Sequence, residues 1–277
     1  MTLVPSAAQP PLPGAAPAGA GRWRVANLQG LGAREDQQDF FAISSLADAC
    51  DPAWLAFVLA DGMGGGEAGA EIAQLAVESL RANLDPSAAE TSFDELIDGI
   101  GQIHRTVAER WRGQGGTTLV VARAVGAELE FASVGDSVLA LVRGGRLYQL
   151  SRRHELVFDR YAAAARGECS VAEALADPQG SALTSFIGGP DLLIDRTRRP
   201  LRLEPGDCLI ACSDGVSDCV SGDLLAELGT EAPEDQVAGL DRAITLQQRA
   251  DQDNYTAVVA HYETPPVADQ AEIRSSP

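Results

Sequence analysis

Residues 54 to 62 read Trp-Leu-Ala-Phe-Val-Leu-Ala-Asp-Gly, an apolar run that ends abruptly in an aspartate and a glycine. A short apolar run that stops at a turn-forming pair predicts a buried β-strand. Asp61 then lies at the rim of the hydrophobic core, where an ionised carboxylate costs several kcal/mol unless a cation lies against it. This stretch therefore predicts a positively charged partner for Asp61.

The same arrangement occurs twice more along the chain. The apolar run at residues 208 to 212 leads into Ser213-Asp214-Gly215, and Asp253-Asn254 precedes the apolar run at residues 255 to 260. A cluster of carboxylates held on rigid strands is a candidate metal site. Because oxygen-only ligand sets favour hard ions, these acids indicate Mg²⁺ or Mn²⁺ rather than zinc.

The composition favours one acidic domain. The chain has 277 residues, 45% of them hydrophobic, which is enough apolar material for a single large core. Its 40 acidic residues against 21 basic ones give a formal charge of −19. That charge argues against a nucleic acid or an anionic membrane surface as a partner. We expect a monomer.

The cysteines and the N-terminal residues indicate a cytoplasmic protein. No run of about 18 apolar residues occurs, and the first 20 residues lack the basic start and apolar stretch of a signal peptide. An odd number of cysteines without Cys-x-x-Cys spacing is typical of reduced thiols. The five cysteines are Cys50, Cys169, Cys208, Cys212 and Cys219.

Three parts of the chain differ in composition. Residues 1 to 20 are rich in Pro, Ala and Gly and, like residues 264 to 277, predict a disordered tail. Residues 21 to 263 form the predicted domain. Within it, residues 155 to 185 are polar, Ala-rich and poorly patterned, which predicts a flap-like loop with a short helix at residues 171 to 176.

The order of the expected elements favours an α+β sandwich. Helical spacing of apolar residues predicts helices at residues 67–84, 93–111 and 233–249. A period of two and short apolar runs predict strands at residues 54–60, 117–125, 128–134, 138–142, 147–150, 192–203, 207–212 and 255–260, with a tight hairpin at Arg143-Gly-Gly-Arg146. Long antiparallel runs with helices grouped before and after them favour helices outside a sandwich over a βαβ fold.

Five acidic motifs, in this order, resemble the metal-dependent protein phosphatases of the protein phosphatase 2C type, and specifically their bacterial branch. Each motif alone is weak, but together they span residues 30 to 260 in the family's order and roughly its spacing. The motifs are Gly32-Ala-Arg34-Glu-Asp-Gln-Gln-Asp39, Ala60-Asp61-Gly62-Met63-Gly64-Gly65, Ser133-Val-Gly135-Asp136-Ser137, Cys212-Ser213-Asp214-Gly215-Val-Ser-Asp218 and Asp253-Asn254-Tyr-Thr256.

The resemblance implies a four-layer α/β/β/α sandwich, two antiparallel sheets flanked by helices, with two Mn²⁺ or Mg²⁺ ions at one edge. In that picture Asp61 bridges both ions and the Gly62 carbonyl binds one of them. Asp214 and Asp253 bind the other ion, and Asp39 acts directly or through a bound water.

The resemblance also implies an activity, the hydrolysis of phosphoserine and phosphothreonine in proteins, opposing a bacterial serine/threonine kinase. Two metal ions can lower the pKa of a bridging water toward neutrality and place a hydroxide in line with a phosphate monoester. Arg34 would bind the phosphate oxygens with its planar guanidinium.

A third ion in this family often lies between an acid four residues after the Asp214 equivalent and an acid just before the His154 equivalent. Asp218 keeps the first of these positions, but Arg153 occupies the second. A guanidinium repels a nearby divalent cation and attracts a free carboxylate. We therefore expect two tightly bound ions and an Arg153–Asp218 pair or a vacancy, with Glu155 or Asp159 as substitute ligands if the loop shifts.

Other enzyme classes fit the sequence less well. The glycines 64, 66 and 69 match a dinucleotide-binding fingerprint, but the chain then enters another helix instead of a second strand that ends in an acid. No cysteine has an arginine six positions on, so a Cys-x₅-Arg phosphate loop is excluded, and three scattered histidines exclude a zinc cage.

The remaining alternative is a phosphatase-like sandwich without activity that binds phosphoproteins or regulates a partner. Four departures from the family pattern support it: Gln38 in place of Glu, Gly66 in place of His, and Val138 and Ser185 in place of Arg. The presence of all the main metal acids favours the enzyme.

Three further polar residues have structural interpretations. Asp136 is expected to be structural, because in the family it lies in a hairpin away from the ions. His104 lies on an apolar helix face and is expected in the core. His154 resembles a histidine near the edge of the family's active site, with either a proton-transfer or a structural role.

Overall fold

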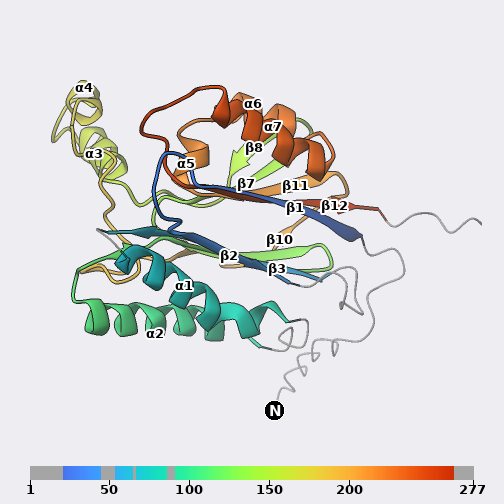
Figure 1. Cartoon of the computed structure of the whole chain (residues 1–277), viewed down its shortest axis with the longest axis horizontal. Coiled ribbons are helices and arrows are strands. Elements are labelled where there is room, and N and C mark those ends of the chain that lie inside the picture. Colours follow the sequence, from blue (N-terminus) through green and yellow to red (C-terminus); the bar gives the residue numbers. More distant parts are fainter. Residues whose placement is uncertain (1–20, 45–53, 65–66, 86–90, 265–277) are drawn as a thin grey trace, which may run out of the picture.

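The chain folds into four stacked layers in a computed structural model that describes residues 21–44, 54–64, 67–85 and 91–264. Two antiparallel sheets lie face to face, one helical layer covers the outer face of each, and a small helical hairpin projects from one end (Figure 1). This is the α/β/β/α sandwich expected from the sequence. Residues 1–20 and 265–277 of the two predicted tails, together with Cys50 and Gly66, lie outside the described residues.

The first sheet has five strands and contains both the first and the last strand of the described chain. Its strands in spatial order are β1 (Arg22–Gly30), β12 (Tyr255–Glu263), β11 (Asp207–Cys212), β7 (Val138–Arg143) and β8 (Arg146–Gln149). The predicted hairpin between β7 and β8 is confirmed, and both turn glycines have positive φ, 58° at Gly144 and 70° at Gly145. Glycine adopts these angles without strain.

The second sheet has seven strands. Its main path in spatial order is β10 (Leu201–Arg202), β6 (Glu128–Val134), β5 (Leu119–Val125), β3 (Trp54–Met63) and β2 (Asp39–Ile43), with β4 (Gly116–Thr117) paired to β3 and β9 (Asp195–Arg196) paired to β6. The sequence predicted one strand over residues 192 to 203. Only two residues of each of β9 and β10 pair in the structure, because the bend around Pro200 separates them.

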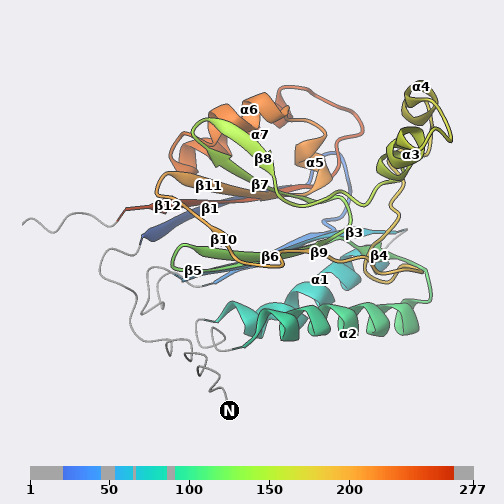
Figure 2. The same ribbon diagram turned by 180° about the vertical axis from the view of Figure 1, so that it is seen from behind.

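Helices pack on the outer faces of both sheets. α1 (Ala68–Leu80), the 3₁₀ helix η1 (Arg81–Leu84) and α2 (Phe93–Trp111) cover the second sheet, and α5 (Asp214–Ser217), α6 (Gly222–Leu228) and α7 (Pro233–Thr245) lie on the first (Figures 1 and 2). Strand β3 is therefore buried on both faces: Leu55 and Phe57 contact the core between the sheets, and Ala56 and Val58 contact the core under α1 and α2. Burial on both faces explains why the run from residue 54 is apolar throughout.

The projecting hairpin is the main departure from the predicted elements. The segment predicted as a loop with one short helix contains two helices, α3 (Leu156–Ala165) and α4 (Val171–Leu175). No residue of α3 is buried, so the helix is not part of a packed core. No helix in the described part of the chain is long and apolar enough to cross a membrane.

Candidate metal centre

Two predicted site acids are neighbours across a pair of strands. Pairing of β2 with β3 places Asp39 directly opposite Asp61. The Asp39 side chain is buried, and its Oδ1 atom has no hydrogen-bond partner. Directly opposite side chains in antiparallel strands start from Cβ atoms about 5 Å apart, so two ionised carboxylates in this arrangement repel each other. The pair therefore needs a cation or a proton between its members.

The backbone of Asp61 is fixed by hydroxyl groups. The Asp61 amide donates to Thr118 Oγ1 at 3.0 Å, and Thr117 Oγ1 donates to the Asp61 carbonyl at 2.8 Å. The Thr118 hydroxyl is also hydrogen-bonded to the Ser137 hydroxyl at 2.7 Å. These contacts hold the end of β3 rigidly, which keeps the Asp61 carboxylate in position to bind a metal ion.

The first sheet contributes the other two acids. Asp214 begins α5 directly after β11, and Asp253 lies just before β12. Ser213 joins the sheets, because its Oγ atom donates to Asp39 Oδ2 at 2.8 Å and accepts from the Thr256 amide at 3.0 Å. The acids predicted from three separate strand ends therefore meet at one edge of the sandwich.

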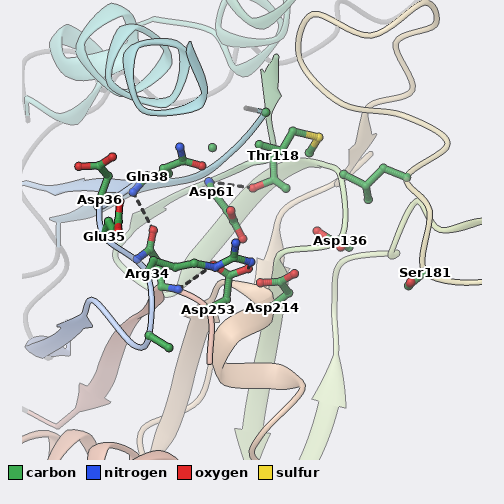
Figure 3. A pocket seen from close by; sticks show the side chains of 16 residues that line it. Arg34, Glu35, Asp36, Gln38, Asp61, Thr118, Asp136, Ser181, Asp214 and Asp253 are labelled. Carbon is green, nitrogen blue, oxygen red and sulfur yellow. Dashed lines mark hydrogen bonds and ion pairs between the residues drawn. The ribbon is translucent and has the colours of Figure 1, made fainter. Parts of the chain in front are cut away.

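These acids line a cleft of about 670 Å³. Figure 3 shows Asp61, Asp214 and Asp253 pointing toward one another, with the Arg34 side chain across them. The cleft is lined by Ala33, Arg34, Glu35, Asp36, Gln38, Asp61, Gly62, Met63, Gly64, Thr118, Asp136, Ser181, Leu183, Asp214, Asp253 and Asn254. Asp39 is buried and is not among these lining residues.

Burial and mutual repulsion raise the pKa values of Asp39, Asp61 and Asp214. Burial raises the pKa of Asp39 to about 6, and the charges of Asp214 and Asp253 act in the same direction. The pKa of Asp61 is raised well above its usual value by burial and by the charge of Asp39. Burial and the Asp136 charge raise the pKa of Asp214 to about 6. A bound divalent cation would remove this penalty, so these residues fit a hard metal ion.

Arg34 forms an ion pair with the fourth acid, Asp253. Arg34 Nη2 lies 2.6 Å from Asp253 Oδ2, and this ion pair raises the pKa of Arg34. Within the described residues, no three histidine, cysteine or acidic side chains are gathered closely enough to hold a metal ion as they stand. A metal ion here would therefore also need backbone oxygens and water in its shell, and it would compete with Arg34 for the Asp253 carboxylate.

Gly62 is required where β3 meets α1. A Cβ atom on Gly62 would collide with the Gly69 carbonyl group, and one on Gly69 would lie 3.1 Å from the Gly62 carbonyl carbon. The Gly62 amide donates to the Gln38 carbonyl at 3.0 Å. Gly62 and Gly69 therefore allow the helix to approach the strand closely, which accounts for part of the glycine pattern without a dinucleotide.

A second charged cluster lies beside the cleft. Arg153 Nη2 lies 2.7 Å from Glu155 Oε1 and 3.4 Å from Asp218 Oδ1. Burial raises the pKa of Asp136 to about 6, while the Arg153 charge lowers it. The expected Arg153–Asp218 pair is present, but Glu155 is the closer partner. Asp136 was expected away from the metal acids, and the structure instead places it in the wall of their cleft (Figure 3).

His154 and His104 have structural contacts. His154 is buried, and its Nδ1 accepts from the Gly135 amide at 3.1 Å while its own amide donates to the Gly135 carbonyl. This fixes the loop that carries Asp136, and burial lowers the pKa of His154. His104 was expected in the core. It is instead half-buried on α2, where its Nδ1 accepts from the Gly188 amide at 3.2 Å.

Comparison with known protein families identifies the family of this chain. The family model for protein phosphatase 2C matches residues 32–238, most of the chain, including Arg34, Asp61 and Asp214. The chain belongs to the protein phosphatase 2C family. As a member, this phosphatase is an enzyme of the protein serine/threonine phosphatase class.

Similar proteins are bacterial phosphatases. The phosphatase is 31% identical over 189 residues to protein phosphatase PhpP of Streptococcus pneumoniae, covering 62% of this chain and 72% of that protein. It is 32% identical over 209 residues to the serine/threonine protein phosphatase PstP of Mycobacterium tuberculosis, covering 73% of this chain and 39% of PstP.

Solved structures share the fold. PppA of Pseudomonas aeruginosa, a regulatory component of a T6SS, superposes with a TM-score of 0.72 at 26% identity, covering 88% of this phosphatase and 99% of that chain. The catalytic domain of PstP in complex with two manganese ions superposes with a TM-score of 0.67 at 25% identity, covering 87% and 98% of the two chains.

The sequence did not predict the residues that support the acids. Thr118 and Ser213 hold Asp61 and Asp39, and Asn254 joins β12 to the segment before β2, since its Oδ1 accepts from the Gln38 amide at 2.8 Å. Hydroxyl residues are common in strands, so Thr118 carries no local signal. Ser213 and Asn254 are next to predicted ligands in the sequence, and this adjacency could have indicated that they support the site.

Proposed function

We propose that this phosphatase hydrolyses phosphoserine and phosphothreonine in proteins with two Mn²⁺ or Mg²⁺ ions and a metal-activated water. The observation that carries the proposal is the pair of facing acids, Asp39 and Asp61, one of which has a buried oxygen atom without a partner. When bound, the ions would lower the pKa of a water and neutralise phosphate charge. Asp39, Asp61, the Gly62 carbonyl, Asp214 and Asp253 are the proposed ligands.

Arg34 is the proposed phosphate-binding residue. Its side chain is 56% exposed and lies across the cleft, with Asp253 as its partner. A phosphate monoester offers the guanidinium the same two-oxygen geometry as the carboxylate. Binding of phosphate to Arg34 would thus release Asp253 to act as a ligand, and Asp39 and Asp61 would orient the attacking water.

The experiment that tests this function measures phosphate release from a phosphothreonine peptide in Mn²⁺, in Mg²⁺ and in excess EDTA. We expect turnover with either metal and none with EDTA, because water and carboxylates alone supply no comparable activation. Turnover that survives EDTA would contradict the metal mechanism. A well-folded protein that binds the peptide but never releases phosphate would support the non-catalytic alternative.

The partners follow from the same proposal. Phosphoproteins are the proposed substrates, and a serine/threonine kinase that makes them is the expected counterpart. Four cysteines of the described residues are free thiols, Cys169, Cys208, Cys212 and Cys219, which supports a reducing, cytoplasmic location.

We further propose that Asp218 binds no third ion in the wild-type protein. The Arg153 guanidinium is largely buried between Glu155 and Asp218, and a divalent cation there would be repelled. We expect two anomalous peaks in a crystal soaked in millimolar Mn²⁺, and a third peak on Asp218 only in the Arg153→Asp variant. A third peak in the wild type would refute this proposal, as would its absence in a folded Arg153→Asp crystal.

A further inference from the structure

One short segment of this acidic chain is strongly basic. Residues 195 to 202 read Asp-Arg-Thr-Arg-Arg-Pro-Leu-Arg and contain four arginines, in a chain whose formal charge is −19. Arg196 makes an ion pair with Asp94 of α2, with 2.6 Å between Nη1 and Oδ1. The other three arginines, Arg198, Arg199 and Arg202, are exposed. We call these three residues the arginine edge.

The arginine edge is unpaired where acids are abundant. Twelve arginines in the described part of the chain make ion pairs, so an arginine here commonly finds an acid. The side chains of Arg198, Arg199 and Arg202 form no ion pair or hydrogen bond with any other described residue, and the Arg202 carbonyl accepts a hydrogen bond from Arg143 Nη2 at 3.0 Å. Three free guanidinium groups within five positions form a local positive site that the fold itself does not use.

The position of this segment connects it to the cleft. β9 and β10 lie at the outer edge of the second sheet, where both pair with β6 (Figure 2). Arg196 is opposite Ala132 and Arg202 is opposite Glu128, while the chain after β6 leads directly to Asp136 in the cleft wall. At about 3.3 Å per strand residue, the segment from Arg196 to Arg202 lies roughly 7 to 20 Å along β6 from the end of that strand at Val134, and at about 4.8 Å per strand spacing β10 lies roughly 14 Å across the sheet from β3, which carries Asp61.

Edge protection alone is a weaker explanation. Charged residues and proline on an edge strand prevent pairing with other chains, and Pro200 serves that purpose here. Acidic side chains would protect the edge equally well, and this chain has almost twice as many acids as bases. The concentration of arginine indicates an anionic partner, because the guanidinium fork binds carboxylates and phosphates through two hydrogen bonds.

We propose that Arg198, Arg199 and Arg202 bind acidic residues of the phosphoprotein substrate while its phosphorylated residue lies at the metal centre. The inference rests on the proposed phosphatase function. An extended peptide spans the distance from the cleft to the arginine edge in about four to eight residues. The preferred substrates therefore carry Asp or Glu four to eight residues from the phosphorylated residue, on one side of it.

The test compares three substrates with the wild-type protein in Mn²⁺. The first is p-nitrophenyl phosphate. The second is a phosphothreonine peptide with glutamates four to eight residues from the phosphothreonine, and the third is the same peptide with glutamines at those positions. Each peptide is made in two versions, with the substituted positions either before or after the phosphothreonine. Exposed ion pairs contribute little individually, so three should lower KM for one glutamate peptide about three- to tenfold relative to its glutamine form. The preference should fall as salt is added.

The decisive variant is Arg198→Glu/Arg199→Glu. We expect it to lose the preference for the glutamate peptide through KM, with unchanged kcat and unchanged turnover of p-nitrophenyl phosphate. The matched control is Arg105→Glu/Arg146→Glu, which makes the same charge change at two other exposed arginines and should keep the preference.

The outcomes separate this inference from the proposed function. Two results would refute substrate binding by the arginine edge without contradicting the phosphatase function. One is a wild-type protein that hydrolyses both peptides with equal KM, and the other is a double variant that keeps the full preference. Loss of preference in the control variant also refutes substrate binding by the arginine edge, because the effect would then be one of net charge. A wild-type protein inactive on all three substrates refutes the phosphatase function itself.

Discussion

Replacing Asp61 with asparagine should lower kcat/KM by at least about 1,000-fold, or about 4 kcal/mol of transition-state stabilisation. Asp61 is the proposed bridge between the two ions, so the substitution removes a negative charge that both ions share. The fold should survive, because Thr117 and Thr118 hydrogen-bond to the backbone of residue 61 and not to its side chain. Phosphopeptide kinetics and Mn²⁺ calorimetry measure the two effects, and both activity and metal affinity should fall.

A matched control distinguishes the loss of the proposed bridging ligand from the loss of one negative charge anywhere on the protein. Asp98→Asn removes one exposed carboxylate from the middle of α2, away from the cleft, and should leave turnover and metal affinity unchanged. An Asp61→Asn protein whose turnover stays within a few fold of the wild type would exclude Asp61 as the bridging ligand.

Replacing Arg34 with alanine should lower kcat/KM by roughly 30- to 1,000-fold, or about 2 to 4 kcal/mol, because the phosphate loses a charge-assisted hydrogen-bonding fork. Metal binding should persist, since Arg34 is not a ligand and its removal frees Asp253 from a 2.6 Å ion pair. Steady-state kinetics and Mn²⁺ calorimetry on the same preparation distinguish the two properties.

Arg34→Lys is the informative companion variant. Lysine keeps the positive charge but lacks the planar fork, so we expect activity between those of the alanine variant and the wild type. Collapse of Mn²⁺ affinity in the alanine variant would instead assign Arg34 a role in organising the acids.

The position of the acids at strand ends could be predicted because two independent signals coincide on them. A continuous apolar run indicates a strand buried on both faces, and an aspartate at its end stands out against that burial, as at Asp61 and Asp214. The facing of Asp39 and Asp61 could not be predicted in the same way. It depends on the register of β2 against β3, and register is set by the whole sheet and the intervening loop rather than by local pattern.

Some of the missed elements have few buried residues, although the missed strand β2, Asp-Phe-Phe-Ala-Ile, is apolar. β1 was not predicted, and only one of its nine residues is buried. α3 is also without a buried face, and α6 is a seven-residue helix directly after α5. Pairings between distant segments, such as Arg34 with Asp253, require the folded chain, since 219 positions separate the two residues.

The Ser213 hydroxyl donates to Asp39 and accepts from the Thr256 amide, so it links the two sheets. The geometry of the cleft therefore depends on how the two sheets are aligned. Asp39 and Asp61 are on strands of one sheet, while Asp214 and Asp253 adjoin strands β11 and β12 of the other. Catalytic constellations tolerate displacements of only about 0.5 Å, so a slight sliding of one sheet over the other would separate the two halves of the site. Substitutions deep between the sheets, at residues such as Phe57 or Leu209, can therefore abolish activity without changing any of the proposed metal-binding residues.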